Sequence, residues 1–152
     1  MSVVILYGTE TGNGELVADA IADVLAADHD PSIHAMDEFA VEDLDTDNFL
    51  VVVCSTYGEG ELPTGAEPFA EALTELAPDL SGLRFAVFGL GDSVYGDTFN
   101  RGGEIIAELL IRHGATQVGE HFRHDNSSVV KPAKAAHEWA GTLTDVIDSV
   151  NA

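Results

Sequence analysis

Residues 49–63 read Phe49-Leu-Val-Val-Val-Cys54 followed by Ser55-Thr-Tyr-Gly-Glu-Gly-Glu-Leu-Pro63. Six consecutive apolar residues, rich in valine and followed by turn-forming residues, predict a short buried strand. The apolar side chains do not alternate with polar ones, so we expect both faces of this strand to be covered. That pattern is typical of a strand inside a parallel sheet.

The rest of the chain repeats the same alternation of strand and helix. Further short apolar runs predict strands at Val3–Tyr7, Ile33–Ala35, Arg84–Phe88 and Thr116–Val118. Apolar residues at helical spacing predict helices over residues 16–25, 68–76, 105–110 (with a stop at His113-Gly114) and 132–150. This order predicts an α/β fold: a doubly wound, five-stranded parallel sheet of order 2-1-3-4-5 with helices on both faces. No linker or repeat interrupts it, so we expect a single domain over residues 1–152.

Composition excludes several classes of partner. The 152 residues carry 27 Asp and Glu against 6 Lys and Arg, a formal charge of −21 that would repel nucleic acid and anionic membranes. The longest apolar run, residues 49–54, is far short of the roughly 20 residues of a membrane-spanning helix, and the first residues do not resemble a signal peptide. The single cysteine, Cys54, cannot form an internal disulfide, which favours a reducing cytoplasm.

The acidity itself has two explanations. The acidic residues are spread along the whole chain, which favours halophilic adaptation, a solvated surface suited to a salt-rich cytoplasm. The alternative is a docking face for a basic redox partner. Both stay open from the sequence, and we prefer the first.

Three glycine-rich loops follow strands that are neighbours in the predicted order, at the edge where such sheets bind ligands. The first is Gly8-Thr-Glu-Thr-Gly-Asn-Gly14, whose backbone N–H groups and hydroxyls suit a phosphate. It matches neither a Walker loop nor the dinucleotide fingerprint. On this loop alone, a plain glycine-rich turn is an equal interpretation.

The second and third loops each place a tyrosine after a buried strand. They are Ser55-Thr-Tyr-Gly-Glu-Gly-Glu-Leu-Pro63 and Gly89-Leu-Gly-Asp-Ser-Val-Tyr-Gly-Asp-Thr-Phe-Asn100. One such tyrosine is more often a surface residue than a ligand platform. Two of them, Tyr57 and Tyr95, at the edge that carries the phosphate loop predict a sandwich around a flat ring. A phosphate and a planar ring together indicate a mononucleotide.

These three motifs, in this order, resemble the flavodoxin family. Thr9-Glu-Thr-Gly-Asn13 is similar to the family's FMN phosphate loop, and Ser55-Thr-Tyr-Gly-Glu-Gly60 and Gly89-Leu-Gly-Asp-Ser-Val-Tyr95 are similar to its two flavin-ring loops. The resemblance extends to the FMN domains of sulfite reductase flavoprotein and nitric oxide synthase. The short stretch from Gly119 to Asn126 resembles the short-chain branch of the family. Three residues, 96–98, separate Tyr95 from Phe99, whereas many members of the family have two there. This difference leaves the ring angle of Tyr95 open.

The resemblance implies FMN as the cofactor and assigns its site residue by residue. The hydroxyls of Thr9 and Thr11 and the backbone of the first loop would hold the phosphate, and Tyr57 and Tyr95 would cover the two ring faces. The implied binding residues are Thr9, Glu10, Thr11, Gly12, Asn13, Gly14, Ser55, Thr56, Tyr57, Gly58, Gly60, Leu90, Gly91, Asp92, Tyr95, Phe99 and Asn100.

The resemblance also implies the function. The chain would be a monomeric one-electron carrier and not an enzyme, taking electrons from a separate reductase and passing them to an acceptor protein. It would work through the neutral semiquinone, with the carbonyl of Gly58 accepting the flavin N5–H. Two alternatives are an accessory FMN protein that activates one specific enzyme, and a flavin-free interaction module on the same scaffold.

Three other features are expected to carry no chemistry. His121 and His124 in the sequence His121-x-x-His124-Asp125 have a spacing that suits a metal, but no third ligand is apparent, so we expect an ordinary exposed pair. Cys54 is expected to be buried and inert. Trp139 lies at helical spacing and is expected to belong to the core.

Overall fold

The apolar run at residue 49 forms the middle strand of a parallel sheet. In this strand, β3 (Phe49–Ser55), successive side chains point to opposite faces, and every residue from Phe49 to Cys54 is buried. Leu50 and Val52 join one apolar cluster, whereas Val51 and Val53 join a second one on the other face. Burial on both faces is therefore the reason why this segment reads as an uninterrupted apolar run.

The structure is a computed structural model that describes residues 2–8, 13–27, 29–55, 62–91, 101–119, 121–125 and 128–151. All described strand pairs are parallel, and the order along the sheet is β2-β1-β3-β4-β5, with β6 also paired to β4. The other strands are β1 (Val3–Gly8), β2 (Pro31–Ala35), β4 (Arg84–Gly91), β5 (Thr116–Gln117) and β6 (Phe122–Asp125). The helices are α1 (Asn13–Leu25), α2 (Glu67–Leu76), α3 (Arg101–Arg112) and α4 (Pro132–Asn151), with 3-10 turns η1 (Met36–Glu38) and η2 (Val41–Asp43).

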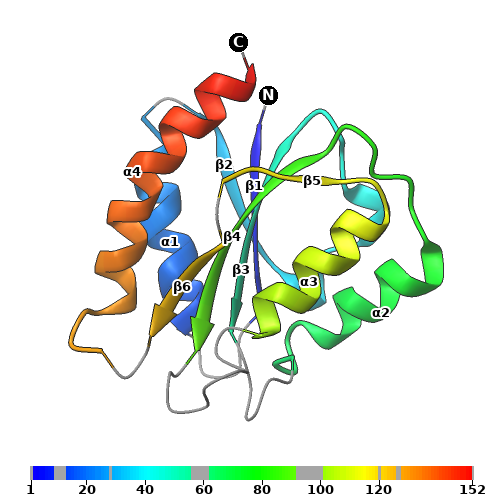
Figure 1. The fold of residues 1–152 in the computed structure, drawn as a ribbon, viewed down its shortest axis with the longest axis horizontal. Coiled ribbons are helices and arrows are strands. Elements are labelled where there is room, and N and C mark those ends of the chain that lie inside the picture. Colours follow the sequence, from blue (N-terminus) through cyan, green and yellow to red (C-terminus); the bar gives the residue numbers. More distant parts are fainter. Residues whose placement is uncertain are drawn as a thin grey trace.

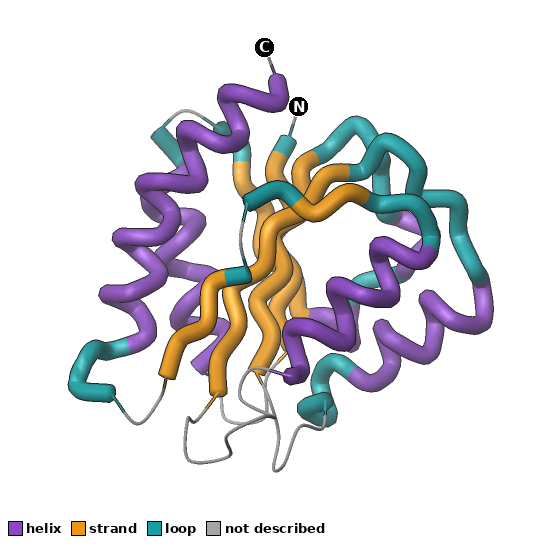
Figure 2. The backbone as a smooth tube through the Cα atoms, in the orientation of Figure 1, coloured by secondary structure: helices purple, strands orange, loops and turns teal. Residues whose placement is uncertain are grey.

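Helices cover both faces of the sheet, as predicted. Helices α1 and α4 pack on one face, and α2 and α3, with η1 and η2, pack on the other (Figure 1). Figure 2 shows the strands as a single layer between these two helical layers. Among the described helices, none is both long and apolar enough to cross a membrane.

The predicted sheet order is confirmed, but its fifth position is built from two short strands. β5 pairs with Arg84 and Phe85 at the start of β4, whereas β6 pairs with residues 88–91 at its end. The sequence predicted only the first of these, at Thr116–Val118. Gly119, with a φ of 75°, lies between the two strands, in a conformation that side chains other than glycine's rarely adopt.

An aromatic cluster holds β6 in place. The ring of Phe122 stacks on Phe88 of β4, with centroids 4.8 Å apart and planes 18° apart. Trp139 of α4 contacts the ring of Phe88 edge-on at 5.4 Å. Trp139 is partly buried against the core, as expected from its spacing. These rings join β4, β6 and α4, and offset stacking adds to their apolar burial.

Helix α3 stops at His113-Gly114, as predicted. Gly114 has a φ of 109°, its N–H donates to the carbonyl of Ile111, and the N–H of Ala115 donates to the carbonyl of Leu110. A methyl group on Gly114 would lie 3.0 Å from the backbone nitrogen of Ser81. The position therefore requires glycine for both backbone conformation and space.

We expect Gly114→Ala and Gly141→Ala to change stability in opposite directions. Gly114→Ala should lower the free energy of unfolding by about 1–2 kcal/mol because of its positive φ. Gly141 lies inside α4 with nothing within 4 Å of an added methyl group, so Gly141→Ala should raise it by about 0.5–1 kcal/mol. Urea denaturation of both variants in the same buffer is the measurement. Equal effects of the two substitutions would contradict this account of Gly114.

Candidate functional site

Three neighbouring strands end together at one edge of the sheet. Gly8, the last residue of β1, pairs with Cys54 of β3, and Cys54 pairs with Gly89 of β4. The carboxyl ends of β1, β3 and β4 therefore lie side by side, at the lower edge of the view in Figure 1. The three glycine-rich loops predicted to form the site leave the sheet at this edge.

The direction of winding reverses at the same edge. Helix α1, which follows β1, packs on one face of the sheet, whereas α2, which follows β3, packs on the opposite face. The two connections therefore diverge between β1 and β3. Ligands of open parallel sheets bind at such a reversal.

Helix α1 begins close to the end of β1 in the chain. The helix begins at Asn13, directly after the first loop, and Gly14 is buried within the first turn. The first N–H groups of a helix have no partner within the helical ladder, and the helix dipole adds positive potential there. A helix start that follows a glycine-rich loop suits a phosphate group.

Gly8 is needed at the end of β1. A methyl group on this residue would lie 2.7 Å from Cβ of Ala66 and 2.9 Å from Sδ of Met36. The turn before α2 and the η1 turn thus pack directly against the end of β1, which fixes where the first loop leaves the sheet. The sequence identified Gly8 as the end of the strand but gave no sign of this contact.

Acidic side chains surround the end of β1. Burial raises the pKa of Tyr7, the residue before Gly8, and four carboxylates raise it further: Glu15, Glu38, Asp37 and Asp19. The electrostatic potential from these side chains is therefore negative at Tyr7, beside the end of β1.

The structure describes five of the predicted FMN-binding residues. Asn13 and Gly14 form the start of α1, Ser55 is the last residue of β3, and Leu90 and Gly91 end β4. Ser55 pairs with Leu90 in the sheet register, so the starts of the second and third loops are adjacent. The side chain of Leu90 is fully buried in the core, and only its backbone could meet a ligand. The others lie outside the described residues: Thr9, Glu10, Thr11, Gly12, Thr56, Tyr57, Gly58, Gly60, Asp92, Tyr95, Phe99 and Asn100.

Cys54 is buried, as predicted. Its side chain has no exposed surface, and burial raises the pKa of the thiol to about 12. The thiol is therefore protonated at neutral pH, and because only the thiolate is a strong nucleophile, it is unsuited to covalent chemistry.

The expectation of an exposed histidine pair was wrong. His124 is only 4 % exposed, because its ring packs beside Phe88, and His121 is largely covered by α3. Burial and, to a lesser extent, the charge of Arg123 lower the pKa of His121 to about 4, against the opposing effect of Glu104. The described residues contain no cluster of three or more potential metal ligands.

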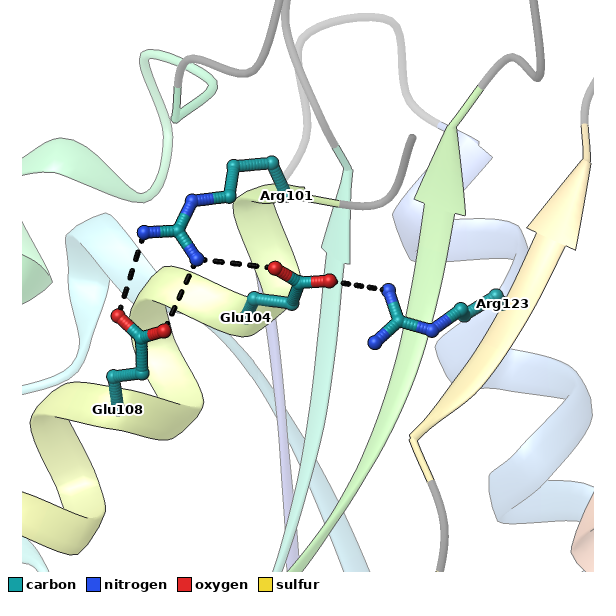
Figure 3. A network of polar contacts seen from close by, with 4 residues as sticks. All are labelled: Arg101, Glu104, Glu108 and Arg123. Carbon is teal, nitrogen blue, oxygen red and sulfur yellow. Dashed lines mark hydrogen bonds and ion pairs between the residues drawn. The ribbon is translucent and has the colours of Figure 1, made fainter. Parts of the chain in front are cut away.

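A polar network that the sequence analysis did not single out joins α3 to β6 (Figure 3). Arg101 donates to Glu104 at 3.0 Å and to Glu108 at 3.0 Å. Arg123 of β6 donates to the other oxygen of Glu104 at 2.6 Å. The spacing of Arg101 and Glu104 indicates a helical ion pair, but the partner on β6 could be found only from the fold.

Two clefts lie elsewhere, and Trp139 lines both of them. One, of about 530 Å³, is lined by Val118, His121 and Leu143. The other, of about 570 Å³, is lined by His124, Val130 and Glu138. Both lie between β6 and α4 and do not include the ends of β1 and β3.

Comparison with known proteins gives the same family that the motifs indicated. The family model described as Flavodoxin matches residues 5–139. Protein MioC of Escherichia coli strain K12 is 32% identical over 147 residues, which cover 95% of this chain and 97% of MioC. The structure of a cysteine-to-alanine mutant of flavodoxin from Pseudomonas aeruginosa superposes with a TM-score of 0.86 at 35% identity, over 97% of this chain and 99% of that one.

The predicted similarity to nitric oxide synthase is also found. Inducible nitric oxide synthase of Gallus gallus is 33% identical over 116 residues, which cover 76% of this chain but only 10% of that much longer protein. The likeness therefore concerns one part of the synthase.

We expect His121 to make the protein less stable as the pH falls. The folded state holds His121 neutral down to about pH 4, whereas the unfolded chain takes up a proton near pH 6.5. Unfolding therefore binds a proton between these values, so stability is lost as the pH falls from 6.5 towards 4. After allowance for partial exposure, the loss should be roughly 1–2 kcal/mol.

Urea denaturation of the wild type and His121→Gln at about pH 7.5 and about pH 4.5 measures this loss. The variant should lose less stability than the wild type. His137→Gln, which changes an exposed histidine on α4, is the control and should behave as the wild type does. An equal loss in the wild type and His121→Gln would contradict the assignment.

Proposed function

Because the chain belongs to the flavodoxin family, whose members are FMN-binding electron carriers, we propose that it carries single electrons from a separate reductase to an acceptor protein. One observation supports this most: β1, β3 and β4 end side by side where the winding reverses, and α1 starts there. Bound FMN supplies a ring that takes up electrons one at a time, and the protein supplies binding and electrostatics.

The described residues fit the phosphate end of FMN. The buried Gly14 and the start of α1 offer small residues and backbone donors, and Gly8 fixes the origin of the first loop. We propose that the hydroxyls of Thr9 and Thr11 complete this phosphate site, and that Tyr57 and Tyr95 cover the two faces of the ring. We also propose that the carrier uses the neutral semiquinone form of the flavin.

The proposal also covers the cellular compartment and the redox partners of the chain. We propose the cytoplasm, because the single cysteine is a buried free thiol that forms no disulfide. We also propose that the charge of −21 reflects a salt-rich environment. The reductase and the acceptor would be separate proteins.

The first test is an absorption spectrum of the purified protein in high salt, before and after FMN is added. We expect a flavin spectrum with quenched fluorescence, because tyrosine rings stacked on the flavin quench it. Stepwise anaerobic reduction with dithionite should then produce the long-wavelength absorbance of a neutral semiquinone. A folded protein that stays colourless after FMN is added would overturn the proposal and favour a flavin-free interaction module.

We also expect salt to tighten the binding of FMN more than that of riboflavin. The first Lys or Arg in the chain is Arg84, so the segments that form the phosphate end contribute only negative charge. The phosphate of FMN carries about −1.5 to −2 at neutral pH, and salt screens its repulsion from the carboxylates around Tyr7.

Fluorescence titrations at several salt concentrations test this expectation. Between about 0.1 M and about 1 M salt, the Kd for FMN should fall by about threefold or more relative to the Kd for riboflavin, which has no phosphate. Circular dichroism at each salt concentration controls for unfolding of the apoprotein. An FMN affinity that falls with salt, relative to riboflavin, would mean that a cation holds the phosphate.

A further inference from the structure

The two lysines of the chain lie together at the start of the last helix. Lys131 precedes α4, Lys134 lies in its first turn, and both side chains are exposed. No Asp or Glu occurs in residues 126–137, so this part of a chain of charge −21 carries a local excess of positive charge. Within the described residues neither lysine forms an ion pair. Both charges are therefore available to another molecule.

This placement of the lysines is unfavourable for the helix. The helix dipole favours negative charge at a helix start and disfavours positive charge. Helices α1, α2 and α3 follow this rule, with Glu15, Glu67 and Glu104 in their first turns. The first turn of α4 has no acidic residue, although the chain has 27 of them. A departure from a local rule that brings no structural gain points to a function for the residues concerned.

Two exposed apolar side chains directly precede the lysines. Val129 is 100% exposed and Val130 is 41% exposed, which costs free energy in water. Val130 also lines the cleft of about 570 Å³ between β6 and α4, together with Phe122 and Trp139. Exposed apolar surface therefore continues from the two valines into a hollow. The charged residues that line this cleft are Arg123, Asp125 and Glu138.

These residues lie at the same edge of the sheet as the candidate site. The N–H of Ser128 donates to the carbonyl of Asp125 at 3.0 Å, and Asp125 pairs with Gly91, the last residue of β4. The start of α4 is therefore close to the carboxyl ends of the strands, at the lower edge of the view in Figure 1. We call this surface the lysine patch; it consists of Val129, Val130, Lys131 and Lys134.

We propose that the lysine patch is the docking surface for an acidic redox partner. Carboxylates of the partner would pair with Lys131 and Lys134 around an apolar contact with Val129 and Val130. An apolar centre with a charged rim is the usual composition of a protein interface. That the partner exchanges electrons rests on the proposed function, whereas the binding of an acidic surface to the patch does not.

Charge complementarity selects an acidic partner over a basic one. The large excess of carboxylates elsewhere in the chain repels an acidic protein, so the lysine patch is where its approach is least opposed. A basic protein would be repelled at the patch and attracted elsewhere. Partners from the salt-rich environment proposed above would be acidic for the same reason as this chain. Concentrated salt screens charges at a distance but does not weaken apolar contact, which gives the valines their part in docking.

Two double variants separate the patch from net charge. Lys131→Gln/Lys134→Gln removes the two positive charges of the patch. Arg84→Gln/Arg112→Gln is the matched control, because it removes two positive charges from exposed side chains at the opposite edge, where β4 begins and α3 ends. Both variants therefore have the same net charge. The thermal midpoint of Lys131→Gln/Lys134→Gln should not fall, because the helix dipole disfavours cations at this end of α4.

The first probe is the peptide Glu-Glu-Leu-Leu-Glu-Glu, whose binding is followed by NMR through the backbone amides of the protein in about 0.5 M salt. We expect the largest shifts in residues 128–138. The Kd of the peptide should rise by about threefold or more in Lys131→Gln/Lys134→Gln, and by less than about twofold in Arg84→Gln/Arg112→Gln. A third variant that removes the apolar part of the patch, Val129→Ser/Val130→Ser, should also weaken binding.

The second probe is a plant-type ferredoxin chosen for its acidic surface. Stopped-flow absorbance measures electron transfer from the reduced ferredoxin to the FMN-loaded protein. The second-order rate constant should fall by about threefold or more in Lys131→Gln/Lys134→Gln and stay within about twofold in the arginine control. The reduction potential of the flavin is measured in each variant, so that a change in driving force is not mistaken for a change in docking.

Several results would overturn the inference. Equal weakening of peptide binding by the two charge variants would mean that only net charge matters. The absence of peptide binding, or shifts centred outside residues 128–138, would exclude the patch as the docking surface. A lower thermal midpoint in Lys131→Gln/Lys134→Gln would give the lysines a structural role, and an unchanged rate with ferredoxin would remove the redox role of the partner. Failure of the wild type to bind FMN, with peptide binding intact, would instead overturn the proposed function.

Discussion

The burial of β3 on both faces is the constraint on which the rest of the structure depends. Leu50 and Val52 need cover from one side, and Val51 and Val53 need it from the other. Helices must therefore pack on both faces of the sheet, which requires connections on both sides and a point where the winding reverses. The reversal of winding between β1 and β3 thus follows from hydrophobic burial, before any residue of the site is considered.

The end of β1 lies near carboxylates and is followed by the start of α1, and a helix start suits an anion. The electrostatic repulsion from the carboxylates around Tyr7 acts over a long range, and concentrated salt limits this range to a few ångströms. Hydrogen bonds from a helix start and from hydroxyls act at contact distance, where salt cannot intervene. A chain of charge −21 can therefore hold a phosphate without a lysine or arginine nearby, provided that its loop brings several neutral donors together.

The sequence predicted the parts of the fold whose residues carry a strong apolar pattern. The runs at residues 3–7, 49–54 and 84–88 became β1, β3 and β4, and Gly114 ended α3 as expected. β6 was missed because Phe122-Arg-His-Asp125 has one clearly apolar residue, and its burial comes from Phe88 and Trp139, which are distant in sequence. For the same reason the burial of His124 could not be predicted. The edge of the candidate site was predictable from the order of the strands. Contacts between elements, such as the close approach of Gly8 and Ala66, could be found only from the structure.

Two kinds of interaction connect β6 to the rest of the structure: aromatic contacts and an ion pair. Stacking of Phe122 on Phe88 and the edge of Trp139 fix β6 to the sheet and to α4, and apolar contacts of this kind do not weaken as salt rises. Arg123 of β6 then donates to Glu104 of α3, so the ion pair joins β6 to the helix whose first turn holds the buried Gly102 and Gly103. A four-residue strand that the sequence pattern does not reveal thereby connects the apolar core to the edge where the ligand loops begin.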